Sequence, residues 1–416
     1  MSLFNACLKK VPKSPADEQI ATMIKKTFAL QYYEPKDYLL DQTAALDTNA
    51  PPARMSSRGV AAAAVSPVAR RSPRLARRGT APVTPAIARG SKTKASSSKP
   101  VADLAVHVST TSADVPFERI SIEAAVPSND EDAAAFDEVF VVPGNPGVPG
   151  FYERFAKSIW TQMEGRARVS VIGYVGHTAS DLGVNGWFSL DEQVQHVTAE
   201  IVNGRGSDTR STSLPRKVAV VGHSIGAEIA MRAMARHPNA IRKVVGLMPF
   251  VLTNERSRLQ RFLASLVRVK ALVLIVAGLV GVLKKVFPFF LREFATKGMD
   301  PDAKRLTESW LRAGSVVNMA LMGRTEFDGL RDPRRDRDRA NLETYADRVH
   351  LMYCEDDHWA PTWQAEAFKA RYGAADVTVE TASRESIKIE HAFVLSDAAA
   401  DFVALRTAGM LGCRVK

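Results

Sequence analysis

Short apolar runs alternate with segments of helical spacing along most of the chain after about residue 103. The runs cover residues 139–142, 169–174, 218–222, 244–248, 349–354 and 377–381. Because most of these runs are apolar at consecutive positions, both faces of the predicted strands must be buried, which is typical of a parallel sheet covered by helices on both sides. Two earlier segments, LAVHVST and ERISIEAAV, alternate apolar and polar positions and predict an antiparallel pair of strands. The pattern therefore predicts one α/β domain over residues 103–416.

The segment Lys217–His237 carries the strongest local signal. A buried strand at 218–222 continues directly into the sequence G-x-S-x-G at 222–226, and apolar residues at helical spacing follow it. This order is the context of a nucleophile elbow, in which a strained turn presents a serine hydroxyl at its apex. Glycines at the two flanking positions avoid collisions with the strand and the helix. Ser224 is therefore the predicted nucleophile.

A serine hydroxyl is a weak nucleophile, so it needs a base within hydrogen-bond reach and an acid that orients the base. In folds with this elbow, the partners follow in the order serine, acid, histidine. The loop after the strand 349–354 offers three carboxylates, Glu355, Asp356 and Asp357. His391 follows the last predicted strand and precedes a helix, which makes it the predicted base. His358 is the rival base, but it follows the acid too closely to be the late-loop residue.

The oxyanion hole of such a site needs two backbone N–H groups. Ile225 follows the nucleophile and is predicted to supply the first. The Gly/Pro loop 143–150 follows a buried strand, at the position where this fold places its second donor. Within that loop Asn145 is the best placed donor, because Pro146 has no N–H. An ordinary turn between a strand and a helix is the alternative interpretation of the loop.

About a hundred residues separate the strands that end at 248 and begin at 349, which predicts an inserted cap at about 250–345. Its segment 271–283, ALVLIVAGLVGVL, holds 13 residues without a charge. As a helix it would span roughly 20 Å, which is short of the roughly 30 Å hydrocarbon core of a bilayer. Two interpretations stay open: a buried cap helix, or an interfacial segment over 262–291 with basic flanks on anionic headgroups.

The first 102 residues differ in composition from the rest. Residues 51–100 hold 11 Lys and Arg and no Asp or Glu, and the net charge of the whole chain is +11, so the basic character belongs to this extension. Its Ala/Pro/Ser/Arg-rich part predicts disorder, while residues 17–33 have the spacing of one amphipathic helix. We expect a solvated linker and no nucleic-acid partner. The three cysteines show no metal-ligand spacing, and no metal or cofactor is expected.

Five motifs spread over residues 115–410 carry a family resemblance. They read PGNPGVPGFYERFAKSIW, GYVGHTAS, GHSIGAEIAMRAMARHP, YCEDDHWAP and IEHAF. The set resembles the lipid droplet-associated hydrolases. That resemblance implies an α/β-hydrolase fold with Ser224 as nucleophile, His391 as base and Asp357 as acid. The chain departs from the family pattern at three positions beside these residues, Cys354, His358 and Glu390.

The resemblance also implies a function. It implies hydrolysis of carboxylic esters of lipids, at the cytosolic face of lipid droplets and the endoplasmic reticulum. It further implies attachment through a hydrophobic stretch in the cap, which favours the interfacial interpretation of 262–291. Two alternatives stay open: a non-catalytic droplet protein that binds or organises lipid surfaces, and an acyltransferase in which an alcohol replaces water at the same triad.

Overall fold

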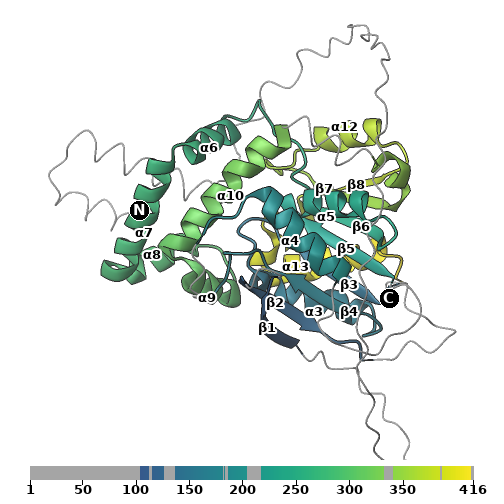
Figure 1. Ribbon diagram of the computed structural model, residues 1–416, viewed down its shortest axis with the longest axis horizontal. Coiled ribbons are helices and arrows are strands. Elements are labelled where there is room, and N and C mark those ends of the chain that lie inside the picture. The colour runs from purple at the N-terminus through teal and green to yellow at the C-terminus, as the bar shows by residue number, and fades with distance from the viewer. Residues whose placement is uncertain are drawn as a thin grey trace, which may run out of the picture. The chain divides into compact units, whose positions relative to one another are not determined.

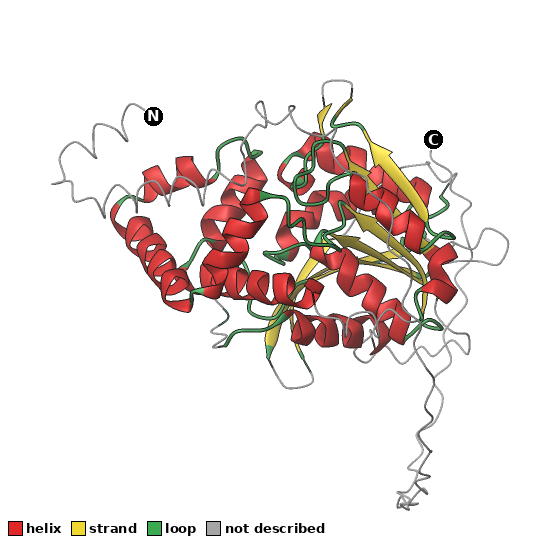
Figure 2. Cartoon of the chain, turned by 90° about the horizontal axis from the view of Figure 1, so that it is seen from above, coloured by secondary structure: helices red, strands yellow, loops and turns green. Residues whose placement is uncertain are grey.

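A computed structural model of the chain describes residues 104–111, 115–125, 136–180, 182, 186–203, 217–331, 341–384 and 387–413. Figure 1 shows the arrangement of their helices and strands, and Figure 2 shows the same molecule from above. The predicted helix at 17–33 and the predicted disordered extension lie outside the described residues.

Eight strands form one sheet in the spatial order β1-β2-β4-β3-β5-β6-β7-β8. They are β1 (Leu104–Thr110), β2 (Pro116–Ile122), β3 (Glu138–Val142), β4 (Arg168–Ile172), β5 (Val218–His223), β6 (Ile241–Leu247), β7 (Val349–Cys354) and β8 (Asp376–Glu380). As the alternating segments predict, β1 and β2 pair antiparallel, with Leu104 opposite Ile122. The pair β2–β4 is also antiparallel, and the remaining pairs are parallel. This is the mostly parallel sheet of an α/β-hydrolase fold.

A two-stranded hairpin follows β8, formed by β9 (Ser383–Arg384) and β10 (Ile387–Lys388). The sequence pattern does not predict it, because a run of two residues shows no periodicity. The hairpin delivers the chain to the loop that carries His391.

Helices cover both faces of the sheet. One face carries α3 (Glu153–Gln162) and α13 (Asp397–Met410), and the other carries α4 (Leu190–Asn203), α5 (Ile225–Arg236) and α12 (Trp363–Arg371). Strand β5 shows why its sequence is apolar without interruption. Val218 and Val220 pack among the side chains of α4 and α5, whereas Ala219 and Val221 pack on the opposite face with those of α3 and α13. Alternation along the strand therefore places apolar residues on two buried faces.

The insertion between β6 and β7 contains five α-helices within the described residues. They are α6 (Arg258–Arg268), α7 (Lys270–Val286), α8 (Pro288–Ala295), α9 (Pro301–Trp310) and α10 (Ala313–Arg331). Helix α10 packs against α6 and α7 on one side and against α4 on the other. It therefore lies between the outer cap helices and the sheet, as Figure 1 shows.

Helix α7 is the apolar segment of the cap, and it buries only one stripe of side chains. Val273, Ala277 and Val280 follow one another at spacings of four and three residues and pack inside the cap. Other apolar side chains of α7 are exposed, among them Ile275, which is 62% exposed. Among the described helices none is long and apolar enough by itself to cross a membrane, but α6 and α7, joined at a 92° bend, pass the same test of length and composition together. Helix α7 therefore packs on the cap along one face and exposes apolar side chains on the other.

The predicted basic flanks of this segment differ in their contacts. The Lys284 ammonium donates to the backbone oxygens of Glu308 at 2.7 Å and Leu311 at 3.0 Å, so it holds the carboxyl end of α9 rather than facing outward. The ammonium of Lys270 lies 3.8 Å from the centre of the Trp187 ring. Lys285 is exposed.

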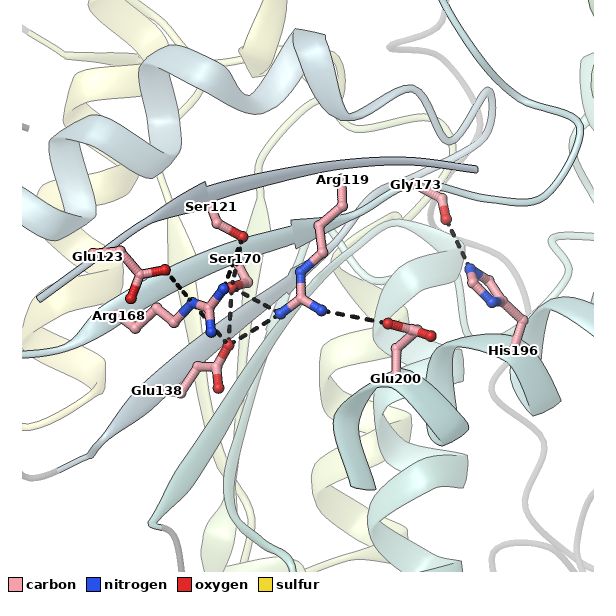
Figure 3. A network of polar contacts seen from close by, with 9 residues as sticks. All are labelled: Arg119, Ser121, Glu123, Glu138, Arg168, Ser170, Gly173, His196 and Glu200. Carbon is pink, nitrogen blue, oxygen red and sulfur yellow. Dashed lines mark hydrogen bonds and ion pairs between the residues drawn. The ribbon is translucent and has the colours of Figure 1, made fainter. Parts of the chain in front are cut away.

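A buried network of charged groups joins β2, β3 and β4, as Figure 3 shows. The Glu138 carboxylate accepts from Arg119 at 3.3 Å and from the Ser170 hydroxyl at 2.9 Å, and Arg119 also reaches Glu200 on α4 at 3.3 Å. Buried charges are tolerated only when they are paired and hydrogen-bonded. Glu138 and Arg168 begin β3 and β4, so the network holds the end of the parallel strands opposite to their carboxyl ends. The carboxyl edge of the sheet is left for the candidate site.

Candidate active site

The turn from β5 to α5 presents Ser224 at the carboxyl edge of the sheet. Its φ of 54° and ψ of −123° lie in a region that residues with side chains rarely adopt. A Cβ atom at Gly222 would lie 2.3 Å from the backbone oxygen of Gly226, and one at Gly226 would lie 2.3 Å from that of Val142. The two collisions that the sequence predicts are thus present, and glycine at both positions lets α5 start against the ends of β3 and β5.

Ser224, His391 and Asp357 form one hydrogen-bonded chain. The Ser224 Oγ lies 2.9 Å from His391 Nε2, and His391 Nδ1 lies 2.7 Å from Asp357 Oδ2. The three residues come from the end of β5, the loop before η3 (Phe393–Leu395) and the turn after β7. The structure therefore brings together, within hydrogen-bond distance, the three residues that the sequence and the family resemblance select.

The environment of Asp357 keeps its carboxyl ionised. Its Oδ1 accepts the N–H groups of Trp359 at 2.8 Å and Ala360 at 3.1 Å. Burial by itself raises the pKa of Asp357, but the His391 imidazole and these two N–H donors outweigh burial and hold the pKa below its usual value. The carboxylate accepts a hydrogen bond from the protonated Nδ1 of His391. In the neutral imidazole Nε2 then carries no proton, so it is able to accept the proton of Ser224.

The other candidate acids and the other candidate base of these loops take no part in the hydrogen bonds between Ser224, His391 and Asp357. Glu355 and Asp356 are exposed, and Asp356 has a φ of 60°, at the point where the turn reverses the chain. The His358 ring contacts Trp359. Glu390, which precedes His391, pairs with Lys388 at 2.5 Å. Among the three carboxylates that the sequence leaves open, only Asp357 is directed at the imidazole.

The loop 143–150 runs beside the nucleophile, since a Cβ atom at Gly144 would lie 3.0 Å from the Cβ of Ser224. The Gly144 N–H is engaged, because it donates to the Tyr152 hydroxyl at 2.7 Å. Within the described part of the chain, the N–H groups of Asn145 and Ile225 have no hydrogen-bond acceptor. Both are therefore free to bond another acceptor, and their role as the two donors of an oxyanion hole stays a prediction.

Contacts from both the sheet and the cap hold this loop in place. Tyr174 donates its hydroxyl to the Pro143 oxygen, and His177 donates Nδ1–H to the Pro146 oxygen at 2.8 Å. From the cap side, the Asn145 amide donates to the Met319 oxygen of α10 at 2.9 Å. N–H groups fixed in this way need little rearrangement when charge develops.

One acidic residue of the cap lies next to this loop. Glu326 on α10 is buried, and burial raises its pKa to about 8, although the nearby Asn145 side chain lowers it in part. Its carboxyl is therefore protonated near neutral pH. The sequence does not reveal this residue, because an isolated acidic position in a helix is usually a solvated one.

Tyr152 and His223 also lie beside the site, and the sequence does not predict either of them. The Tyr152 hydroxyl lies 2.5 Å from Nδ1 of His223, and Nε2 of His223 lies 2.8 Å from the backbone oxygen of His391. The one available signal is that His223 directly precedes the serine in G-x-S-x-G. Among the described residues, no three or more His, Cys, Asp or Glu side chains are placed to hold a metal ion.

Comparisons with known proteins place these residues in a wider context. A family model described as lipid-droplet associated hydrolase matches residues 137–394, a range that includes Asn145, Ser224, Asp357 and His391. A lipid droplet-associated hydrolase of Dictyostelium discoideum is 23% identical over 285 residues, which cover 67% of this chain and 88% of the relative. Its counterpart in Gallus gallus is 22% identical over 276 residues, which cover 64% of this chain and 82% of the relative.

The fold also has counterparts among solved structures. The haloalkane dehalogenase DatA from Agrobacterium tumefaciens C58 superposes with a TM-score of 0.53 at 15% sequence identity, covering 75% of this chain and 97% of that one. At this identity the likeness concerns the fold alone.

Proposed function

Because the chain belongs to the lipid-droplet associated hydrolase family, we propose that it is a serine hydrolase that cleaves carboxylic esters of lipids, with Ser224 as nucleophile. The observation that carries the proposal is the chain of two hydrogen bonds from Ser224 through His391 to Asp357, at 2.9 Å and 2.7 Å. A strained serine turn and two available N–H groups beside it support the same chemistry.

The reaction follows from the direction of these bonds. His391 Nε2 removes the Ser224 proton as the oxygen attacks the acyl carbon, and Asp357 stabilises the imidazolium that forms. The N–H groups of Ile225 and Asn145 bind the oxyanion of the tetrahedral intermediate. His391 then donates its proton to the departing alcohol. In the second half of the reaction His391 removes a proton from water, the water attacks the acyl-enzyme, and His391 returns the proton to Ser224 as the acid departs.

Labelling with a fluorophosphonate probe tests this proposal. The wild-type protein on lipid droplets is expected to be labelled, Ser224→Ala is expected to be unlabelled, and Ser309→Ala, at an exposed serine of α9, is expected to match wild type. If wild type reacts no more than Ser224→Ala, the catalytic proposal fails and the non-catalytic alternative takes its place.

Supplying a lipid ester with and without an alcohol acceptor separates hydrolysis from acyl transfer. Hydrolysis releases the free fatty acid at the same rate in both cases. An acyltransferase instead forms a new ester when a sterol or a diacylglycerol is added.

The cap supports a lipid surface as the place of action. Eight large apolar residues along α7 and α8 are between 36% and 70% exposed: Leu274, Ile275, Val282, Val286, Phe287, Phe289, Phe290 and Phe294. Large exposed apolar surfaces mark interaction sites with membranes or partners. We propose that residues 262–291 dock on the surface of lipid droplets and the endoplasmic reticulum, from the cytosolic side.

Flotation with purified droplets tests this docking. We expect the double variant Ile275→Glu/Phe289→Glu to stay in the soluble fraction, because charged side chains resist transfer into the acyl region. The matched control is Val106→Glu/Val108→Glu, at two equally exposed positions of β1 that are 61% and 58% exposed. The docking proposal is wrong if the cap variant floats as well as wild type.

A further inference from the structure

A second chain of hydrogen bonds runs behind the candidate triad. The Gly144 N–H donates to the Tyr152 hydroxyl at 2.7 Å, that hydroxyl lies 2.5 Å from His223 Nδ1, and His223 Nε2 lies 2.8 Å from the His391 backbone oxygen. It therefore starts in the loop of the predicted oxyanion donor and ends on the backbone of the predicted base. Neither Tyr152 nor His223 has a part in the reaction described above.

The chemistry of the groups fixes the direction of every bond in this chain. A backbone oxygen only accepts, so Nε2 of His223 must carry the proton that it donates to His391. In a neutral imidazole the other nitrogen is then an acceptor, and the Tyr152 hydroxyl donates to it. The lone pairs of Tyr152 remain free to accept from Gly144. One arrangement of protons therefore satisfies all the groups of the chain.

Burial keeps this arrangement of protons constant near neutral pH. Burial, and with it the charge on His391, lowers the pKa of His223 to about 3. Burial also raises the pKa of Tyr152 above its usual value. The imidazole and the phenol thus both stay neutral, and the chain acts through geometry rather than through a changing charge.

The position of His223 excludes direct contact with a substrate. Its side chain is buried, and its ring packs against the rings of Phe393 at 5.0 Å and His391 at 5.2 Å. A histidine in an ordinary core needs a hydrogen-bond partner for each ring nitrogen, and any buried polar group can serve. Here both nitrogens are bonded to groups whose spacing about Ser224 decides whether an acyl carbon can be attacked.

We propose that His223 and Tyr152 are positioning residues that hold the His391 backbone and the oxyanion loop at a fixed spacing around Ser224. The inference rests on the proposed function for the roles of Ser224, His391 and Asn145. Tyr152 and His223 are 71 residues apart, and His223 and His391 are 168 residues apart. These residues are too far apart in sequence for local backbone geometry to fix the distance between the oxyanion loop and the His391 backbone. The hydrogen bonds through Tyr152 and His223 connect the two directly.

Substitutions at His223 separate its two bonds. His223→Gln keeps an N–H donor near the place of Nε2, whereas His223→Asn keeps a polar group only near Nδ1 and cannot reach His391. His223→Phe keeps the ring volume and removes both bonds. Because a misplacement of about 1 Å can cost ~100-fold in rate, we expect a ~10–100-fold lower labelling rate for His223→Asn and His223→Phe, and a loss within ~3-fold for His223→Gln.

The same variants are expected to lower kcat for ester hydrolysis and to leave KM unchanged, because His223 does not touch the substrate. Tyr152→Phe removes one hydroxyl and is expected to reduce the rate to an intermediate value. The matched control is His350→Phe, which removes a buried histidine near the amino end of β7 that pairs with Asp376 at 3.0 Å. That variant is expected to change the melting temperature without changing the rate.

A nuclear magnetic resonance measurement makes the test independent of turnover. With ¹⁵N-labelled histidine, the imidazole signals of His391 report its tautomer, its titration and the proton shared with Asp357. We expect these signals to change in His223→Phe, to return toward wild type in His223→Gln, and to be unaffected in His350→Phe. Where His223→Phe does not fold, His223→Gln and Tyr152→Phe supply the same comparison.

The outcomes distinguish the two proposals. If wild type is labelled and every His223 and Tyr152 variant keeps its rate and its His391 signals, the positioning inference is overturned and the proposed function stands. If wild type is labelled no more than Ser224→Ala, while His391 signals still follow the His223 substitutions, the proposed function fails and the positioning inference stands.

Discussion

Replacing Asp357 by asparagine tests the proton directions of the site with almost no change in shape. The backbone N–H groups of Trp359 and Ala360 point at one carboxylate oxygen, and His391 Nδ1 lies 2.7 Å from the other. The amide oxygen of an asparagine therefore turns toward the two N–H donors, and its NH₂ group faces His391. Because NH₂ only donates, Nδ1 must become the acceptor and Nε2 must carry the proton. In that tautomer, His391 cannot take the proton of Ser224.

The size of the effect follows from what is lost. The distance of 2.9 Å between His391 and Ser224 remains, but the bond runs in the wrong direction, and the negative charge beside the imidazolium disappears. We expect kcat/KM to fall by about 10³–10⁴-fold, which corresponds to about 4–5.5 kcal/mol of transition-state stabilisation. Folding should be little affected, because the Trp359 and Ala360 bonds are kept.

The assay is the rate constant of fluorophosphonate labelling, with ester hydrolysis measured beside it. The control is Asp356→Asn at the adjacent exposed position, where the φ of 60° is one that asparagine tolerates. It is expected to match wild type. A folded Asp357→Asn protein that keeps a rate within about threefold of wild type would refute the reasoning, since the carboxylate would then not orient the base.

Three further predictions concern stability. Gly226→Ala places a Cβ atom 2.3 Å from a backbone oxygen at the end of β3, so we expect the free energy of unfolding to fall by about 1–3 kcal/mol, whereas Gly278→Ala in α7, with no atom within 4 Å, should not destabilise in the same denaturant titration. Because burial raises the pKa of Glu326 from 4.5 to about 8, the folded protein keeps a proton that the unfolded chain releases; stability should fall from about pH 5 to 8 by at most about 1.4 kcal/mol per pH unit, and Glu326→Gln should flatten that dependence in denaturation curves. Lys284→Met frees two backbone oxygens at the end of α9 and should lower the melting temperature, while Lys285→Met at the exposed neighbour should not; equal melting temperatures would show that the two bonds contribute nothing.

Features that depend on consecutive residues are the ones that sequence reasoning predicts. The elbow is an example, because the strand, the two glycines, Ser224 and the helix are covalent neighbours whose spacing alone determines the turn. The parallel strands are another, because an apolar run such as 218–221 has to be buried on both faces wherever it lies. The position of His391 after the last strand follows from the order of elements in the fold.

The selection of Asp357 depends on tertiary structure. Three carboxylates follow β7 on one turn, and which of them faces His391 depends on the backbone reversal at Asp356 and on two N–H groups of the next residues. Order along the chain leaves all three possible and only the family resemblance favours Asp357, whereas the turn geometry separates them physically.

The cap and the second hydrogen-bond chain show the same division. Helical spacing predicts α7 from its sequence, but the position of α10 decides that Val273, Ala277 and Val280 are covered while the opposite face is open. His223 looks like any residue before a serine until Tyr152 and His391 are placed on either side of it. Local sequence determines backbone geometry over a few residues, whereas the partners of a buried polar group are set by the packing of segments that lie far apart along the chain.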